Sequence, residues 1–324
     1  MMSAIKILAL GPNPALQRVL SFDTPLSIGG VNRATAADCY VGGKGQGMAL
    51  ALQLWSPGSS AVAHFLGGDN GRFVESSLAH AGLEQVVQQV AAPTRICTTL
   101  LTGGDSPTEL IDPSGAVTSD EVDELLAKIK AYLLSSKVGG IALCGTTPPG
   151  AGALYASTCQ NLLADPALDS VLLLLDGHKN VDEVLSTGRV DVLKINCDEA
   201  RALTGKSTPE LAAEALLSGD GAPLSRPNAL LALTDGPKPA RLFARGGASW
   251  TLTVPRIECV NAIGAGDVCT GVLLHSLAQG MPPPDAFAMG LAAACARCQH
   301  NLPEFSREEV ETMRQEIQIE EDGK

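Results

Sequence analysis

Aromatic side chains, long apolar runs and positive charge are all scarce in this sequence of 324 residues. Phenylalanine, tryptophan and tyrosine make up 3% of it, and no apolar run approaches the ~20 residues that a membrane-spanning helix needs. Lysine and arginine (23) are fewer than aspartate and glutamate (35), so the net charge is −12. Because such a chain repels nucleic acid and anionic membranes, we expect neither of them as a partner.

The chain also lacks the pattern of a disulfide-stabilised or secreted protein. Its nine cysteines are odd in number and scattered through apolar stretches, which favours a reducing compartment. The first apolar stretch, residues 5–10, follows no basic segment, so we interpret it as a buried strand and not as a signal peptide. These features predict a cytoplasmic protein. Cys295 and Cys298 form a C-x-x-C pair, which we interpret as small core residues of a helix because no second ligand pair accompanies it.

Short apolar runs alternate with helical patterns along most of the chain. The runs are continuous, as in strands that are covered on both faces, and they span residues 7–10, 61–66, 140–143, 171–175, 190–195 and 230–234. The helical patterns span residues 45–54, 70–81, 119–134, 208–217 and 268–279. This alternation predicts an α/β fold, with a doubly wound, mostly parallel sheet and helices on both of its faces.

Two stretches, at about 14–40 and 95–117, break this alternation. Each contains strand-like pieces with turns and no helix between them. We therefore predict one small antiparallel β-sheet that projects from the main domain, a shape typical of a lid. The domain with its lid is expected to span residues 1–305, and residues 306–324 are expected to form a charged, helical C-terminal tail.

The strongest local feature is the sequence Asn261-Ala262-Ile263-Gly264-Ala265-Gly266-Asp267, which precedes an apolar helix. Two glycines before a helix let backbone N–H groups converge, and the helix N-terminus adds partial positive charge, so a phosphoryl group could be held there. Asp267 would then be able to accept the proton of an attacking hydroxyl. The alternative interpretation is an ordinary turn with a capping aspartate.

Further glycine-rich turns lie next to predicted strands and helices. Residues 41–47 read V-G-G-K-G-Q-G. This is not the phosphate-binding loop G-x-x-x-x-G-K-[ST], but Lys44 supplies a point charge for an anionic ligand. A flexible turn with a solvated lysine is the alternative. Residues 145–150, G-T-T-P-P-G, follow a strand, and ligands bind at the carboxyl ends of strands in open α/β sheets.

Two more strand ends carry polar side chains. Residues 194–199 read K-I-N-C-D-E, in which Asn196 is followed three residues later by Glu199. This pair could orient hydrated Mg²⁺. The same spacing occurs in a helix capping box, which is the alternative. Thr234-Asp235-Gly236 is another strand end with a turn.

In this order, the motifs resemble those of the PfkB (ribokinase-like) carbohydrate kinases, from about Ile5 to Ala296. The nearest branch contains 1-phosphofructokinase and tagatose-6-phosphate kinase, because it shares the sequences at residues 13–16, 94–95 and 108–111. The resemblance implies a ribokinase-like fold with a β lid. It implies phosphoryl transfer from ATP, with Mg²⁺ and optionally a monovalent cation, to a hydroxyl of a sugar phosphate. It also implies a homodimer formed through the lid.

The same resemblance assigns roles to individual residues. Asp267 would be the catalytic base, and the backbone amides of Gly264, Ala265 and Gly266 would form an anion hole. On the nucleotide side it implies Lys194, Asn196, Glu199, Thr234 and Gly236, of which Asn196 and Glu199 would hold Mg²⁺ through water. On the substrate side it implies Asn13, Gln17, Gly42, Gly43, Lys44, Arg95 and Arg33. For Arg33, a solvated position on the lid is the alternative.

Three positions depart from the family's motifs. Gln17 stands where the family has a sugar-binding aspartate, Gly47 where it has an asparagine, and Pro239 where the nucleotide loop has a second glycine. Each lost hydrogen bond is worth about 0.5–1.5 kcal/mol. Two alternatives to a kinase for a ketohexose phosphate therefore stay open. One is a kinase for an unphosphorylated sugar or a nucleoside, and the other is a catalytically idle structural relative.

Overall fold

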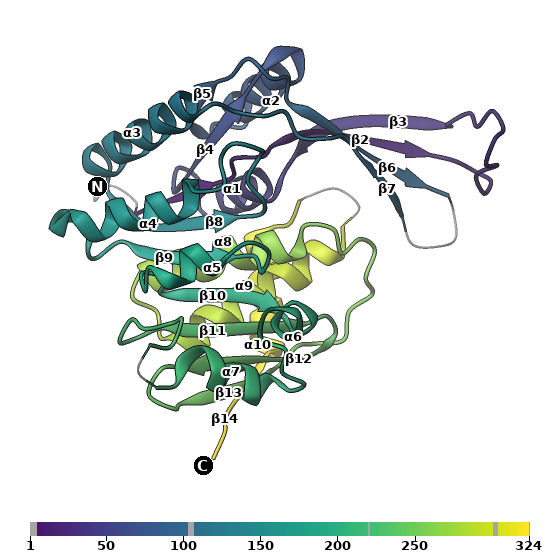
Figure 1. The fold of residues 1–324 in the computed structure, drawn as a ribbon. Coiled ribbons are helices and arrows are strands. Elements are labelled where there is room, and N and C mark those ends of the chain that lie inside the picture. The colour runs from purple at the N-terminus through teal and green to yellow at the C-terminus, as the bar shows by residue number, and fades with distance from the viewer. Residues whose placement is uncertain (1–4, 103–106, 220, 301–303, 324) are drawn as a thin grey trace.

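The computed structural model of the protein describes residues 5–102, 107–219, 221–300 and 304–323. Its main body is a ten-stranded sheet (Figure 1). In spatial order the strands are β14 (Gln318–Glu321), β13 (Ser249–Thr253), β12 (Lys238–Ala244), β11 (Leu230–Asp235), β10 (Val192–Asn196), β9 (Leu172–Asp176), β8 (Val138–Cys144), β1 (Lys6–Leu10), β4 (Ser60–Leu66) and β5 (Glu84–Gln89). Neighbours from β5 to β11 are parallel, and those from β11 to β14 are antiparallel. The predicted mostly parallel sheet is confirmed.

Helices cover both faces of this sheet, as predicted. In β1, Leu8 and Leu10 face the core on one side, where the helices are α3 (Ser119–Ser135), α4 (Leu154–Ala164), α5 (Asp182–Ser186), α6 (Cys197–Thr204) and α7 (Pro209–Leu217), with a 3₁₀ turn at Pro166–Leu168. Ile7 and Ala9 face the core on the other side, where the helices are α1 (Lys44–Trp55), α2 (Gly68–His80), α8 (Ala265–Ala278), α9 (Pro283–Cys298) and α10 (Arg307–Glu316). Because both faces are buried, the strands are continuous apolar runs.

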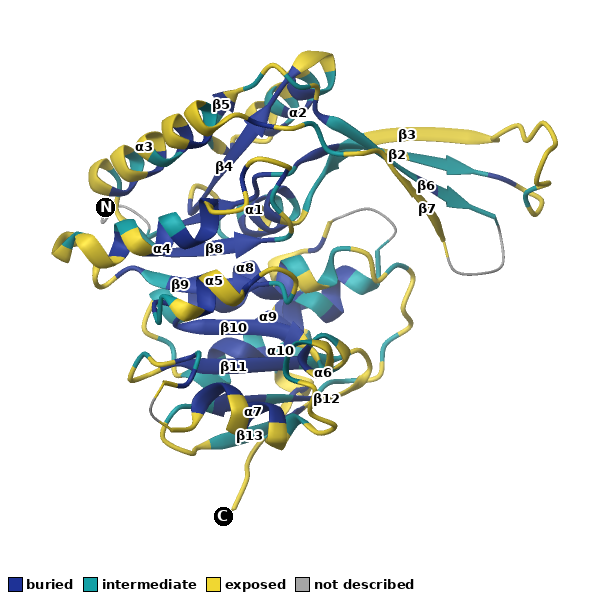
Figure 2. Ribbon diagram, in the orientation of Figure 1, coloured by how far each residue is buried: buried dark blue, intermediate teal, exposed yellow. Residues whose placement is uncertain are grey.

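A second sheet of four strands projects from one end of the main body (Figure 1). Its order is β3 (Ala36–Gly42), β2 (Ala15–Ser21), β6 (Arg95–Leu101) and β7 (Thr108–Ile111). The outer pairs are antiparallel but β2 and β6 are parallel, so the prediction of a fully antiparallel sheet is wrong in its central pair. The reason is that each of these two strands leaves the main body separately and in the same direction. Most of β3 and all of β7 are exposed (Figure 2).

The C-terminal segment differs from the charged tail that we expected at 306–324. Helix α10 is present, but β14 pairs with β13 and forms an edge of the large sheet. Asp322 accepts hydrogen bonds from Arg241, Ser249 and Thr251. The segment therefore packs onto the main body. Its charged composition did not reveal this, because edge strands are commonly charged.

None of the helices in the described ranges is long and apolar enough to cross a membrane.

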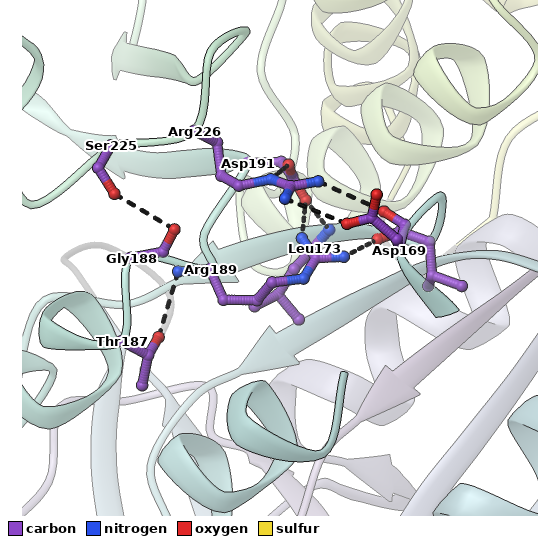
Figure 3. Close-up of polar contacts among 9 residues, drawn as sticks. Asp169, Leu173, Thr187, Gly188, Arg189, Asp191, Ser225 and Arg226 are labelled. Carbon is purple, nitrogen blue, oxygen red and sulfur yellow. Dashed lines mark hydrogen bonds and ion pairs between the residues drawn. The ribbon is translucent and has the colours of Figure 1, made fainter. Parts of the chain in front are cut away.

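A buried ion pair connects the strands at their amino ends (Figure 3). The Arg189 guanidinium has no exposed surface and donates to Asp191 Oδ2 and to the Val171 carbonyl, at 2.5 Å each. The Asp191 carboxylate also accepts from the Leu173 N–H (2.7 Å) and from Arg226 Nε (3.1 Å). These residues precede or begin β9, β10 and β11, so the network holds the three strands in register.

We expect Asp191→Ala to lower the free energy of unfolding by about 3–5 kcal/mol, because it leaves the Arg189 guanidinium buried without a counter-charge. Urea unfolding followed by circular dichroism measures this change. Asp169→Ala is the matched control, since the Asp169 side chain is exposed and pairs with Arg226, and it should cost less than about 1 kcal/mol. Equal effects of the two variants would contradict the structural role given to the buried pair.

Candidate active site

Polar side chains from four elements meet at the carboxyl ends of the central strands. Asp176 is the last residue of β9, and Lys194 lies in β10. Lys44 is the first residue of α1, and Asp267 is in the first turn of α8. Neighbouring parallel strands end at the same edge of a sheet. This edge therefore brings together residues that are far apart in the sequence.

The Asp176 carboxylate is at the centre of this group and is only 4% exposed. Lys44 Nζ lies 3.3 Å from its Oδ1, and Lys194 Nζ lies 3.6 Å from its Oδ2. The Thr270 hydroxyl donates to Oδ2 at 2.5 Å. Burial disfavours the charged carboxylate, but the two lysines and Thr270 outweigh it and lower the pKa of Asp176. Asp176 therefore stays ionised and holds both ammonium groups at the site.

The two lysines stay charged although they differ in exposure. Lys194 is 3% exposed, whereas the Lys44 side chain is 44% exposed. Burial disfavours each ammonium, but the carboxylates of Asp176, Asp267 and Glu199 together outweigh it, so the pKa of both lysines is raised. Two fixed positive charges therefore lie at this edge of an otherwise acidic protein.

Sequence reasoning missed Asp176, although a signal for it exists. An aspartate directly follows the apolar run of residues 171–175. A carboxylate at the end of a buried parallel strand is placed at the edge of the sheet where ligands bind.

The half-buried Asp267 carboxylate lies beside this cluster. Burial and the negative charge of Asp176 raise the pKa of Asp267 to about 7, against the opposing effect of Lys44 and Lys194. At neutral pH a large fraction of the Asp267 carboxyl groups is thus ionised. The ionised carboxylate is also basic enough to accept a proton. This pKa suits a general base.

The turn before Asp267 has the geometry of a helix start. Gly264 has a φ of 83°, a left-handed conformation that favours glycine, and it precedes the first residue of α8. The Ala265 amide donates to the Ala262 carbonyl at 3.2 Å. A β-carbon added at Gly266 would lie 3.9 Å from Lys194 Nζ. The turn is thus next to the ammonium of Lys194, as an anion-binding turn would need to be.

Gly47, in the first turn of α1, faces the carboxylate of Asp267. A β-carbon added at Gly47 would lie 3.1 Å from Asp267 Oδ2. The departure from the family's motif at this position therefore removes a side chain directly beside the candidate base. It leaves bare backbone along one side of the carboxylate.

The predicted substrate residues at the base of the lid form one connected group. The Asn13 side chain donates to Ser114 Oγ (2.9 Å) and Thr146 Oγ1 (3.3 Å), and Arg95 Nη2 donates to the Asn13 carbonyl (3.1 Å). Arg95 also lines a cavity together with Asn13, Pro12, Pro14, Thr94 and Pro148. The structure thus brings Asn13 and Arg95 together at the junction of lid and main body.

Gln17 lies within the lid, where its Nε2 donates to Thr99 Oγ1 at 2.8 Å. A β-carbon added at Gly42 would lie 3.1 Å from Gln17 Cβ. Gly43, with a φ of 115°, precedes Lys44. The bare backbone of Gly42 therefore allows β3 to lie close to β2, and that of Gly43 leaves room for Gln46 at the start of α1.

Arg33 is not brought to this group within one chain. It lies in the exposed segment between β2 and β3, beyond the Ser21 end of the lid strands. That end is about 20 Å along the strand from Ala15, at a rise of about 3.3 Å per residue. Figure 1 shows the β2–β3 connection at the far end of the lid.

Asn196 and Glu199 form a helix capping box, the alternative that the sequence left open. Asn196 Oδ1 accepts from the Glu199 N–H (2.8 Å), and Glu199 Oε2 accepts from the Asn196 N–H (2.9 Å). Glu199 Oε1 lies 3.3 Å from His178 Nδ1. Among the described residues, no group of three or more carboxylate, imidazole or thiol side chains is arranged to bind a metal ion. A lone carboxylate still suits Mg²⁺, which keeps several waters and takes further ligands from phosphates.

Thr234 and Gly236 lie next to this capping box. Thr234 is opposite Asn196 in the register of β10 and β11, and Gly236, with a φ of 58°, belongs to the turn into β12. Pro239 is exposed in β12. The register in which β12 pairs with β11 shifts beside it, between Leu233 and Asp235 of β11. The missing N–H of Pro239 therefore interrupts no regular ladder.

The fold and the site define a carbohydrate kinase. A family model described as pfkB family carbohydrate kinase matches residues 18–309, and the protein belongs to this family. The family assignment confirms the resemblance inferred from the ordered motifs.

Three known proteins illustrate the relationship. A 1-phosphofructokinase from Haloferax volcanii is 29% identical over 305 residues, which cover 89% of each chain. A 1-phosphofructokinase from Bacillus subtilis is 24% identical over 303 residues, which cover 88% of this chain and 89% of the other. The tetrameric inhibited form of phosphofructokinase-2 from Escherichia coli has the same fold, with a TM-score of 0.83, 19% identity, and coverage of 96% and 99% of the two chains.

We expect Asp267→Asn to stabilise the protein more at high pH than at low pH. The folded state raises the pKa of Asp267 from 3.8 to about 7. Ionising this carboxyl therefore costs stability that builds up as the pH rises from about 4 to 7 and is complete above that range. Asparagine carries no charge, so the midpoint of thermal unfolding of the variant relative to the parent should rise between about pH 5 and pH 8.5.

The exposed Asp123 of α3 provides the control, because Asp123→Asn makes the same change at an exposed position. A difference between Asp267→Asn and the parent protein that does not change with pH would contradict the raised pKa.

Proposed function

We propose that this carbohydrate kinase transfers the γ-phosphoryl group of ATP to a hydroxyl of a ketohexose phosphate, such as a fructose or tagatose phosphate. The observation that carries the proposal is the Asp267 carboxylate, with a pKa of about 7, beside two lysine ammonium groups at the start of α8. The name of the curated relatives, 1-phosphofructokinase, supports a phosphorylated ketohexose as the acceptor, with fructose 1-phosphate as the first candidate.

In this proposal the acceptor hydroxyl gives its proton to Asp267 while its oxygen attacks the γ-phosphorus, and ADP leaves with the electrons of the broken P–O bond. Lys44 and Lys194 stabilise the charge on the transferring oxygens, and the N-terminus of α8, at Gly264, Ala265 and Gly266, adds partial positive charge. Because phosphoryl transfer depends mostly on position and charge, a preformed pair of ammonium groups suits it.

The nucleotide phosphates would lie at the carboxyl ends of β10 and β11, near Lys194, Asn196, Glu199, Thr234 and Gly236. When bound, Mg²⁺ would neutralise phosphate charge, and Glu199 and Asn196 would hold it through water. His178, which faces Glu199, would orient that carboxylate. A monovalent cation is a further proposed cofactor, as the family resemblance implies.

The acceptor would lie between the lid and α1, against Asn13, Gln17, Gly42, Gly43 and Lys44. Arg95 would bind its phosphate group, because a guanidinium donates two parallel hydrogen bonds to phosphate oxygens. We further propose a cytoplasmic homodimer formed through the lid. The exposed strands β3 and β7 support this, since unpaired strand edges need cover.

The direct test is ATP consumption with Mg²⁺ for the parent protein and for Asp267→Asn. The panel contains fructose 1-phosphate, fructose 6-phosphate, tagatose 6-phosphate, free hexoses, ribose and nucleosides. We expect turnover of one ketohexose phosphate, and a loss of about 10²- to 10⁴-fold in kcat in the variant, because the general base is removed. Unchanged turnover in Asp267→Asn would overturn the mechanism.

Two other outcomes of this panel favour the alternatives. Turnover only of an unphosphorylated compound would favour a sugar or nucleoside kinase, for which the bare backbone of Gly47 beside Asp267 leaves space. Absence of turnover together with absence of ATP binding, in a folded protein, would favour the catalytically idle relative.

Arg95→Ala should raise the KM for the ketohexose phosphate by roughly 10- to 100-fold, because a charged hydrogen bond contributes about 1.5–3 kcal/mol. The KM for ATP should not change. Arg72→Ala, which removes an exposed arginine that pairs with Asp69 on α2, is the control. The KM for a phosphorylated acceptor is compared with that for an unphosphorylated one, in the parent and in Arg95→Ala. If the two KM values are equal in both proteins, Arg95 does not bind the phosphate.

A further inference from the structure

Two polar side chains are completely buried beneath the start of α1. Gln46, on α1, and His64, on β4, have no exposed surface. Gln46 Nε2 donates to the carbonyl of Gly11, directly after β1 (2.8 Å), and lies 3.1 Å from His64 Nδ1. Neither side chain has a place in the proposed chemistry. Burying an amide and an imidazole is unfavourable without hydrogen bonds, so their presence needs a physical reason.

The imidazole of His64 is neutral and has a defined tautomer. Burial lowers the pKa of His64 to about 3. Because Gln46 Nε2 is a donor, His64 Nδ1 accepts and the ring proton is on Nε2. The Gln85 side chain of β5 faces the ring, although His64 Nε2 has no hydrogen bond of normal geometry within the described residues. The contact from α1 to β4 is therefore independent of pH in the neutral range.

The backbone around this pair is packed without free space. A β-carbon at Gly45 would lie 2.5 Å from Gly11 Cα, and one at Gly43 would overlap Gln46 Oε1. The first turn of α1 therefore contacts the end of β1 directly, and the Gln46 amide joins the two. Lys44 lies between Gly43 and Gly45, so any shift of this turn would move the Lys44 ammonium as well.

We propose that Gln46 and His64 are a positioning pair, which fixes the start of α1 so that the Lys44 ammonium is held beside Asp176 and Asp267. The inference rests on the proposed function, because it concerns the geometry around the candidate base. Apolar side chains of the same size would fill the space without the desolvation penalty. They would leave the Gly11 carbonyl without its donor and the first turn of α1 without a directional contact.

The position of Lys44 has a measurable electrical effect. Within the described ranges, the titratable groups that interact with Asp267 are Asp176 from β9, Lys44 from α1, Lys194 from β10 and the thiol of Cys144 at the end of β8. Burial and Asp176 raise the pKa of Asp267, and the two lysines lower it. If Lys44 moved away, the pKa of Asp267 would rise further, and activity at acid pH would fall.

The test compares Gln46→Met with Gln53→Met, the same change in the same helix. The Gln53 side chain bonds to the backbone of Gly58, Ala81 and Gly82 at the other end of α1. We expect Gln46→Met to lower kcat/KM for the ketohexose phosphate by about 10- to 100-fold, as a displacement of about 1 Å does. The acid limb of its pH profile should move up by about half a pH unit, from the distance dependence of the Lys44–Asp267 attraction. Gln53→Met should keep the parent's profile.

Two variants of His64 keep the inference testable if Gln46→Met does not fold. The Asn side chain of His64→Asn offers an oxygen acceptor near the place of Nδ1, so it should retain the parent's acid limb. His64→Leu fills the space but offers no acceptor, so it should reproduce the shift of Gln46→Met. If Gln46→Met and His64→Leu lower the thermal stability but change neither the acid limb nor kcat/KM, the two side chains have only a structural role. This result would overturn the inference.

The controls also separate this inference from the proposed function. The proposed base predicts that the activity of the parent protein falls on the acid side of about pH 7 and that Asp267→Asn removes this acid limb. If either result is not observed, the proposed base is wrong. If that limb exists and does not move in Gln46→Met or in His64→Leu, the base stands and the positioning pair is wrong.

Discussion

A single buried carboxylate, Asp176, holds two ammonium groups that come from different parts of the molecule. Lys194 belongs to the sheet and Lys44 to the first turn of α1. Burying charges such as those of Asp176 and Lys194 is unfavourable by several kcal/mol for each ion. The arrangement is stable because the Asp176 carboxylate accepts hydrogen bonds from Lys44 and from the Thr270 hydroxyl and lies 3.6 Å from the Lys194 ammonium. The surrounding elements must therefore be held accurately. The tight packing of α1 on the end of β1 provides this.

The same arrangement explains the behaviour of Asp267. Burial and the neighbouring negative charge of Asp176 destabilise the Asp267 carboxylate, and its pKa rises to about 7. The two ammonium groups limit this rise and would bind the anionic reactants. In the proposed function, the site thus combines a base that can accept a proton with positive charge for phosphate groups, within a protein of net charge −12. The charge balance of the whole chain says little about this local field.

Much of the fold follows from the order of residues along the chain. The continuous apolar runs indicated buried parallel strands because both faces of the sheet are covered. The glycines before Asp267 indicated a helix start, and Gly264 directly precedes the first residue of α8. The lid strands were also predicted, but the parallel pairing of β2 with β6 was not. That pairing depends on how two distant segments leave the main body, and no local pattern encodes it. Strand β14 was missed because its short, charged sequence resembles a solvated tail.

By itself, the sequence determined the family and the alternation of buried strands with helices, because these depend on local patterns and on their order, and it predicted candidate site residues. Only the tertiary structure decided which of them meet. It joined Asp176, Lys44 and Lys194, separated Arg33 from the other substrate residues within one chain, and placed Gly47 against Asp267. It also paired Gln46 with His64. The physical reason is that burial, pKa and hydrogen bonding depend on distances through space, and these are fixed only when the sheet, the helices and the lid pack together.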